Sequence, residues 1–294
     1  MRHADKILTR PVFREVTLAA VKTTYNELAL KFSAPGDLSQ LMANTTVKHY
    51  LGGEWLDRYV HYKSPHARYL RVDINAPAPG KMKAMMRYWE FAETLLNLQN
   101  IGGFEAVLDE LEHGKIESAC GELDVARMIA FHRLKFCFVK PTRGMKRNYD
   151  FEIWYPDGFK VCAEAAAKFE ATLPRAKSIK RSLRASRAQL PDDEPTVIFV
   201  KVPEGWISDI ELAEQIRAVA LDYLRQSDHV ASVKYYTPVT IYTTKATARW
   251  HAYCEVSNPK FPNRNWDMFR DETVPMNGFP PWWIRFYPEL RLPE

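Results

Sequence analysis

The chain has 294 residues, which favours one large domain or two smaller ones. Its apolar share of 46% and charged share of 26% are typical of a soluble globular protein and exclude a disordered chain, while a net charge of +5 does not establish a nucleic-acid partner. No apolar stretch is long enough for a membrane span or a signal-peptide core, and the four cysteines form no CxxC pair, so we expect a cytoplasmic protein with reduced thiols and no membrane partner.

Residues 1–100 are predicted to form a mainly helical N-terminal region. Apolar residues recur near a helical period from Leu18 to Leu30, and a methionine and aromatic stripe predicts a second helix over 81–97. Between them, glycine and proline pairs indicate a loop-rich stretch that ends in a break at 77–80. A further break at Ile101-Gly102-Gly103 marks the first predicted domain boundary.

Residues 101–260 alternate between helical and strand patterns and are predicted to form one α/β domain, a mixed central sheet flanked by helices. The predicted helices are 116–130, 175–189 and 210–224, and the predicted strands are 134–139, 149–155, 159–166, 196–202, 232–242 and 248–256. Pro156-Asp157-Gly158 is a strong hairpin signal, because Asp-Gly readily takes the backbone angles of a tight turn. The tail, 261–294, is rich in aromatic residues and proline; we expect it to pack over the fold, with a base-stacking surface as the alternative.

Acidic residues occupy three informative places in this domain. Glu122 lies on the first predicted helix, Asp150 at the start of the hairpin, and Glu164 at a similar distance beyond its turn. Antiparallel pairing would bring Asp150 and Glu164 onto neighbouring strands. Two oxygen ligands close together suit Mg²⁺ or Mn²⁺, whereas each acid taken singly is equally well explained as a solvated side chain.

The order helix, three strands, helix, strand over about 114–202 resembles the core of the PD-(D/E)XK nuclease superfamily, a restriction-endonuclease-like core. Glu122, Asp150 and Glu164 in Glu164-Ala165-Ala166 carry the resemblance. It implies that Asp150 and Glu164 hold Mg²⁺ or Mn²⁺, that Glu122 holds a bound water or a second ion, and that a phosphodiester bond of a nucleic acid is hydrolysed.

The chain departs from that superfamily at Ala166, where its Glu-x-Lys pattern would place a lysine. Such a lysine orients the attacking water and stabilises charge developing on the phosphate. Lys168 lies one strand step further along the same face, about 6 to 7 Å away, and Lys160 is a weaker substitute. Three explanations stay open: a lysine that has moved to Lys168, a natural loss of activity, or a deliberate replacement of the lysine.

The predicted helix 175–189 and the turn before Asp150 are strongly basic. The resemblance places phosphate-contacting residues there, whereas the general alternative is a solvated basic face. The predicted nucleic-acid-binding residues are Arg147, Lys177, Lys180, Arg181, Arg184, Arg187 and Gln189. A glutamine at the end of this helix supports the site in some members of the superfamily.

Together these features predict a metal-dependent nuclease that acts on nucleic acid, DNA being favoured over RNA, and that is impaired by Ala166. The predicted catalytic residues are Glu122, Asp150, Glu164 and Lys168. The alternative is a non-catalytic nucleic-acid- or protein-binding module on a degenerate nuclease fold, and a third reading is an interaction protein without a nucleic-acid partner. The oligomeric state is left open.

Overall fold

The computed structural model describes residues 35–61, 63–64, 69–71, 75–132, 134–140, 149–168, 175–242, 247–261 and 274–275. The predicted helical pattern near Leu18, the basic turn with Arg147 and nearly all of the predicted tail lie outside these residues. The chain divides into two compact units whose main junction falls between Gln99 and Asn100.

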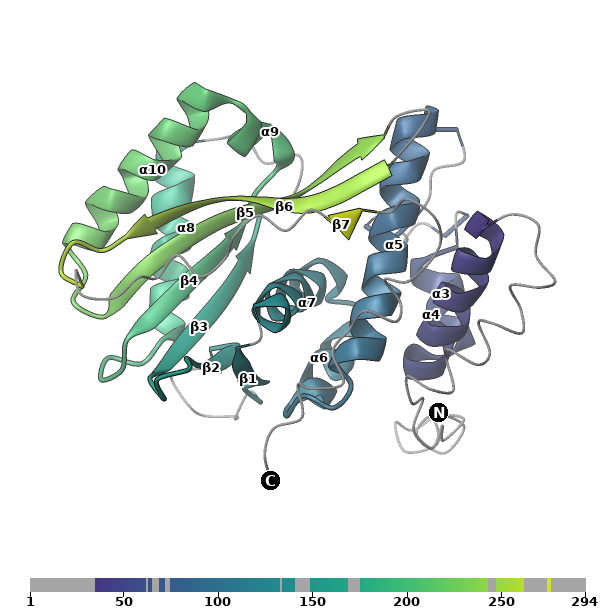
Figure 1. Cartoon of the computed structure of the whole chain (residues 1–294), viewed down its shortest axis with the longest axis horizontal. Helices are drawn as coiled ribbons and strands as arrows, with labels where there is room; N and C mark the ends of the chain where they lie inside the picture. The colour runs from purple at the N-terminus through teal and green to yellow at the C-terminus, as the bar shows by residue number, and fades with distance from the viewer. Residues whose placement is uncertain are drawn as a thin grey trace. The chain divides into compact units, whose positions relative to one another are not determined.

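The first unit contains three described helices, α3 (Pro35–Leu51), α4 (Gly53–Tyr59) and α5 (Ala78–Leu98). α3 packs along α5, where the Tyr88 hydroxyl donates a hydrogen bond of 2.8 Å to Asn44 Oδ1 (Figure 1). The ring of Trp55 on α4 stacks on Phe91 of α5, with the ring centroids 5.9 Å apart. Large aromatic side chains therefore form much of the core of this unit.

The loop-rich reading of the stretch up to residue 80 was partly wrong. α4 begins directly after Gly52, which takes a φ of 85° at the helix N-cap. α5 begins at Ala78, inside the predicted break, with Pro79 in its first turn. Proline is tolerated there because the first turn of a helix has no intrahelical partner for its N–H groups. Glycine and proline thus mark helix starts here, where local pattern reading suggested a loop.

The second unit contains a seven-stranded mixed sheet, counted over the described residues, whose strand order follows the chain order. The strands are β1 (Lys135–Phe138), β2 (Phe151–Trp154), β3 (Lys160–Ala167), β4 (Thr196–Lys201), β5 (Val230–Tyr242), β6 (Thr247–Ser257) and β7 (Val274–Pro275). β1, β2 and β3 pair antiparallel, and β3, β4 and β5 pair parallel. The helices of this unit are α6 (Phe104–Glu112), α7 (Ile116–Phe131), α8 (Ala176–Gln189), α9 (Glu204–Ser208) and α10 (Ile210–Arg225). The predicted α/β class with a mixed, helix-flanked sheet is confirmed.

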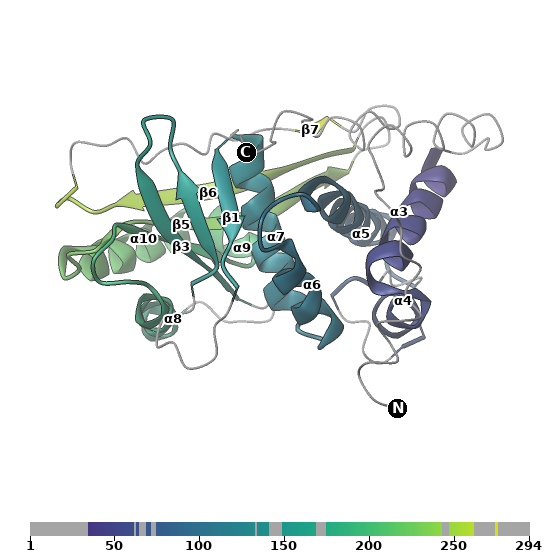
Figure 2. The same ribbon diagram turned by 90° about the horizontal axis from the view of Figure 1, so that it is seen from below.

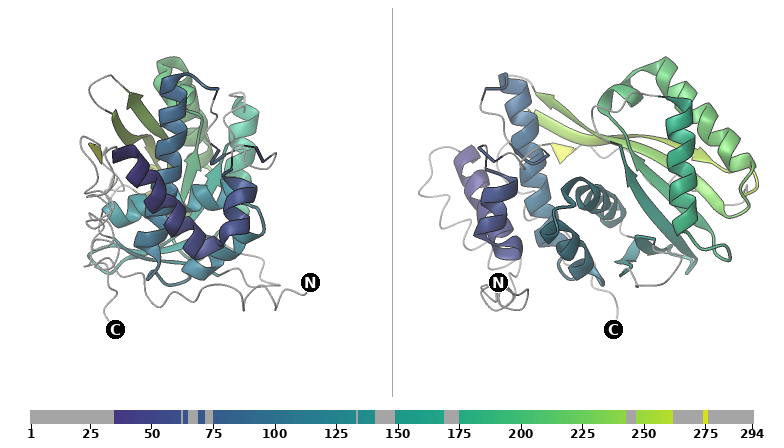
Figure 3. Two further views of the ribbon diagram at one scale, coloured as in Figure 1. Left: turned by 90° about the vertical axis from the view of Figure 1, so that its right-hand side faces the viewer. Right: turned by 180° about the vertical axis from the view of Figure 1, so that it is seen from behind.

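Helices cover both faces of this sheet. α8 and α10 pack on one another and lie together on one face, where Tyr235 of β5 joins their apolar core (Figure 3). α7 covers the other face and lies beside β1 (Figure 2). There the Tyr236 hydroxyl donates a hydrogen bond of 3.0 Å to the carbonyl oxygen of Gly121. Neighbouring residues of a strand point to opposite faces, so Tyr235 packs on the side of α8 and α10 and Tyr236 on the side of α7.

The predicted hairpin between β2 and β3 is confirmed. Gly158 takes a φ of 81°, a left-handed conformation that favours glycine. The backbone N–H of Phe159 donates to Asp157 Oδ1 at 3.1 Å, and the N–H of Tyr155 donates to the carbonyl of Phe159 at 2.9 Å. This short turn sets the strand register, in which Phe151 pairs with Ala163.

At Gly103, adding even the smallest side chain is expected to destabilise the fold. Its φ is 80°, and a Cβ atom would overlap the backbone carbonyl of Phe138. We expect Gly103→Ala to lower the free energy of unfolding by about 3 kcal/mol or more, because conformational strain adds to the overlap. Chemical denaturation of the purified chain measures this change.

The matched control is Gly158→Ala, where φ is also positive but open space surrounds the added atom. Only the strain of about 1 kcal/mol is then expected. Equal losses in the two variants would contradict the proposed overlap with Phe138.

Candidate active site

The strand register places Asp150 and Glu164 side by side. Phe151 pairs with Ala163, so extending the antiparallel ladder by one residue sets Asp150 opposite Glu164. The backbone N–H of Asp150 donates to the carbonyl of Ala163 at 3.0 Å. In return, the N–H of Ala165 donates to Asp150 Oδ2 at 2.7 Å. The Asp150 carboxylate is thus held against the backbone next to Glu164, as the hairpin spacing predicted.

Glu164 is 5% exposed and is also contacted from α8. Gln189, at the last position of that helix, donates from Nε2 to Glu164 Oε1 at 2.6 Å. When Glu164 is ionised, its other oxygen, Oε2, is buried and has no hydrogen-bond partner among the residues that the structure describes. When Glu164 is protonated, it forms a hydrogen bond with Asp150. Gln189 was predicted to bind nucleic acid, and the resemblance also implied that it supports the site; the structure brings it onto Glu164.

Glu122 of α7 is the third acid of the group and is 9% exposed. It interacts with Asp150 through charge and forms a hydrogen bond with Glu110 on α6. Glu110 in turn pairs with Lys115 at 2.7 Å, and the ammonium of Lys115 opposes in part the rise that burial causes in the pKa of Glu122. Glu110 and Lys115 were missed in the sequence, because an acid on one helix and a lysine before the next show no pattern without the α6–α7 packing.

Burial and the charge of neighbouring acids raise the affinity of this group for protons. Burial and then the neighbouring Asp150 carboxylate raise the pKa of Glu164 and of Glu122. Burial raises the pKa of Asp150 as well, although its hydrogen bond from Ala165 opposes the rise. Crowded carboxylates with raised pKa values are stabilised either by retained protons or by a cation.

This acidic group offers few side chains that could bind one metal ion. Among the residues that the structure describes, no set of three or more acidic, histidine or cysteine side chains is arranged to hold a metal ion. Asp150 and Glu164 remain as a two-carboxylate pair with one partnerless oxygen. A pair of this kind fits Mg²⁺, which is commonly bound by one or two carboxylates together with waters and phosphate oxygens.

Lys168 and Lys160, the two lysines that could replace the one expected at position 166, contact groups other than the acidic pair. The backbone N–H of Lys168 continues the β3–β4 ladder to the carbonyl of Lys201, at 2.9 Å. The pKa of Lys168 is lowered because its amine is partly desolvated and the Arg181 guanidinium lies nearby. Lys160 pairs with Glu152 at 3.2 Å and with Glu194 at 2.9 Å. The structure therefore brings Lys168 towards another cation and engages Lys160 with other acids.

Some of the predicted basic residues of α8 form ion pairs, and others are exposed to solvent. Lys180 pairs with Asp222 of α10 at 2.7 Å, and Arg187 pairs with Asp192. Gln189 comes two residues after Arg187, about 200° further round the helix. The basic side chains that meet α10 thus lie on the opposite side of α8 from the contact with Glu164. Lys177, Arg181 and Arg184 are exposed at the helix surface.

Comparison with known protein families finds no family model that matches this chain, and no curated protein matches it. Across the described parts of the chain, the helices are too short or too polar to span a bilayer.

Proposed function

We propose that this protein belongs to the metal-dependent nucleases and hydrolyses a phosphodiester bond of a nucleic acid. The observation that carries the proposal is the buried pair of Asp150 and Glu164, whose carboxyl groups adjoin across the β2–β3 ladder. Burying adjacent acids as ions is costly, so the ionised pair would be stabilised by a cation bound between the two groups.

In the proposed site, Asp150 and Glu164 hold a Mg²⁺ or Mn²⁺ ion. When bound, the ion activates a water molecule and neutralises charge on the phosphate. The residues of the chain position this pair: Ala165 fixes Asp150 through its N–H, and Gln189 orients Glu164 through its amide. Glu122, held by its hydrogen bond to Glu110, lies close enough to act on Asp150 through charge, and when ionised it would strengthen binding of the cation.

The connectivity of the second unit gives additional support. A helix (α7), three antiparallel strands (β1 to β3), a crossover helix (α8) and a parallel strand (β4) follow one another in the order that the nuclease resemblance requires. Fold alone does not imply function. The proposal therefore rests on the carboxylate pair, and the connectivity agrees with it.

The second candidate function is a non-catalytic nucleic-acid-binding module on the same fold. The observation that favours it is Ala166, together with a Lys168 amine whose neighbouring charge is Arg181. Without an oriented cation at the reacting phosphate, the rate of hydrolysis falls by orders of magnitude while binding is retained. The cleavage experiment on Ala166 in the Discussion separates the two functions.

The metal site is tested by calorimetric titration of the metal-free chain with MgCl₂ and MnCl₂. We expect one divalent ion to bind, and Asp150→Ala to weaken its binding by about tenfold or more, because the ion loses one of two charged ligands. Asp193→Ala is the matched control, since Asp193 is an exposed acid away from the pair. Absence of binding, or equal binding by the two variants, would remove the metal site.

A further inference from the structure

A cavity of 290 Å³ lies between α8, α10 and the turn that leads from α10 into β5. It is lined by Lys180, Arg184, Arg187, Tyr223, Gln226, Ser227, Asp228 and His229. The three basic residues come from one side of α8, which faces away from the Gln189 contact with Glu164. The cavity is therefore distinct from the carboxylate pair.

The basic side chains that line this cavity differ in how far other groups already neutralise them. Arg184 has no ion-pair partner in the described part of the chain, and Lys180 and Arg187 pair with Asp222 and Asp192. Both of these aspartates have 57% exposed side chains, which weakens the two pairs, but Arg187 also donates from Nη1 to the carbonyl oxygen of Leu190 at 3.0 Å. An anion in the cavity can therefore bind Arg184 and compete for Lys180, with Arg187 adding positive charge beside them.

Tyr223 supplies a hydroxyl at the inner side of the cavity lining. The residue is 8% exposed, and within the described part of the chain its buried hydroxyl has no hydrogen-bond partner. Burial raises the pKa of Tyr223 to about 12, although the Arg187 and Arg184 guanidinium groups nearby oppose the rise. The hydroxyl thus keeps its proton and lies near the two arginines. A buried polar group without a partner is unusual, and a ligand oxygen would satisfy it.

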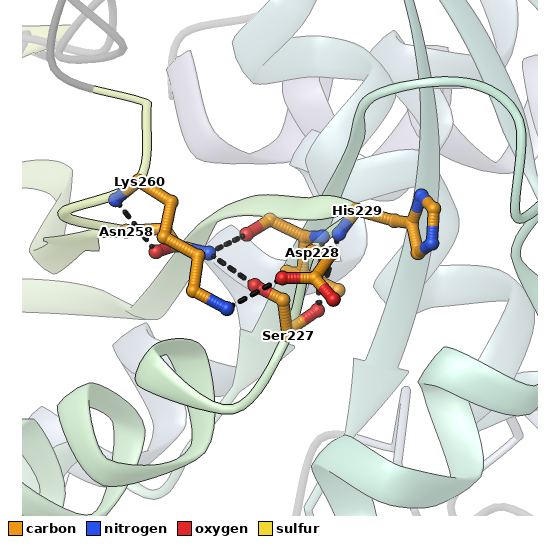
Figure 4. Close-up of polar contacts among 6 residues, drawn as sticks. Ser227, Asp228, His229, Asn258 and Lys260 are labelled. Carbon is orange, nitrogen blue, oxygen red and sulfur yellow. Dashed lines mark hydrogen bonds and ion pairs between the residues drawn. The ribbon is translucent and has the colours of Figure 1, made fainter.

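The turn that forms the third wall is held in place by the residues after β6. Asn258 Nδ2 donates to the carbonyl oxygens of Ser227 and Val230, at 2.9 and 2.8 Å (Figure 4). Asp228, the acid on this wall, pairs with Lys260 in an exposed contact that offsets its charge only in part. The His229 ring extends away from Asn258 and Lys260 (Figure 4). The wall is therefore preorganised by the Asn258 contacts.

We propose that this cavity binds a phosphate group, carried by a nucleotide or by a nucleic-acid strand. Arginine presents a planar set of donors that matches phosphate oxygens, and Arg184 and Arg187 supply two such sets beside the lysine and the phenol. The cavity is larger than a phosphate ion alone, so it has room for part of a sugar or base. This inference extends beyond phosphodiester hydrolysis, because it requires none of the acids of the carboxylate group.

The proposal is tested by calorimetry on the full chain at constant ionic strength, with sodium chloride as the reference salt. The probes are inorganic phosphate, adenosine 5′-monophosphate, and short oligothymidylates with a 5′-phosphate or a 5′-hydroxyl end. We expect Arg184→Gln to weaken phosphate binding about tenfold or more, and Tyr223→Phe to weaken it less, in line with the loss of a charged and a neutral hydrogen bond. Arg217→Gln, an exposed arginine of α10 outside the cavity, should bind as the unmodified chain does.

The probes also distinguish the source of the phosphate. Binding of the nucleotide and of the 5′-phosphorylated strand alone would identify a terminal phosphate, and equal binding of the 5′-hydroxyl strand would identify a backbone phosphate. Failure of every probe to bind, or unchanged affinity in Arg184→Gln and Tyr223→Phe, would overturn the proposal. Glu164→Gln should retain this binding even if it abolishes metal binding, which separates the cavity from the proposed nuclease site.

Discussion

Replacement of Ala166 by lysine is expected to raise Mg²⁺-dependent cleavage of nucleic acid about a hundred- to a thousand-fold, the usual effect of one oriented electrostatic donor. Ala166 is two residues after Glu164 on β3, so a side chain there lies on the same strand face. Glu164, Asp150 and Glu122 act on one another through charge, and in the proposed nuclease site the added lysine would supply the missing cation. The measurement is cleavage of labelled single- and double-stranded DNA and RNA with Mg²⁺ or Mn²⁺.

Two further variants distinguish between the explanations for that result. In Lys168→Ala the weak activity of the unmodified chain should persist, because Lys168 lies near Arg181. If instead Lys168→Ala is crippled and Ala166→Lys gains little, the lysine has moved to position 168. The double variant Ala166→Lys with Asp150→Ala should be silent, which excludes a contaminating nuclease. Silence of all the chains with retained binding of nucleic acid would leave the binding module as the function.

Without a divalent ion, the free energy of unfolding is expected to fall as the pH rises above about 4 to 5, where carboxyl groups titrate in an unfolded chain. Burial raises the pKa of Glu122, Asp150 and Glu164 in the folded protein, and repulsion by neighbouring carboxylates adds to the rise. The folded state therefore binds more protons than the unfolded state, and stability is present at low pH and lost as these groups ionise. A bound Mg²⁺ should reduce this loss, because it favours the ionised carboxylates.

Glu164→Gln should stabilise the metal-free chain by on the order of 2 kcal/mol at pH 8, and by less at pH 5. The amide keeps the size of Glu164 and an oxygen to accept from Gln189 while removing the buried charge. Denaturation at both pH values, with and without Mg²⁺, measures this effect. Glu152→Gln is the control, because Glu152 is paired with Lys160 and is more exposed. Equal stabilisation by both variants at both pH values would contradict the proposed repulsion.

Short-range sequence signals predicted much of the second unit correctly. The Pro156-Asp157-Gly158 turn, the amphipathic pattern of α7 and the continuous apolar run of β4 each depend on neighbouring residues, and each forms where it was expected. Because a short turn sets the hairpin register, the same signals also predicted that Asp150 and Glu164 would adjoin. The α/β class and the central carboxylate pair could therefore be derived without coordinates, while the restriction-endonuclease likeness stays a prediction.

Contacts between distant parts of the chain could not be derived in this way. The basic pattern of α8 suggested a single phosphate-binding face, but α10 packs against the helix and engages Lys180, while Gln189 turns to Glu164. The approach of Glu122 to Asp150, and the cavity between α8 and α10, likewise need separate elements to dock. Local patterns report which face of an element is apolar. Which polar groups meet across two elements is decided only when tertiary packing sets their distance and removes water from between them.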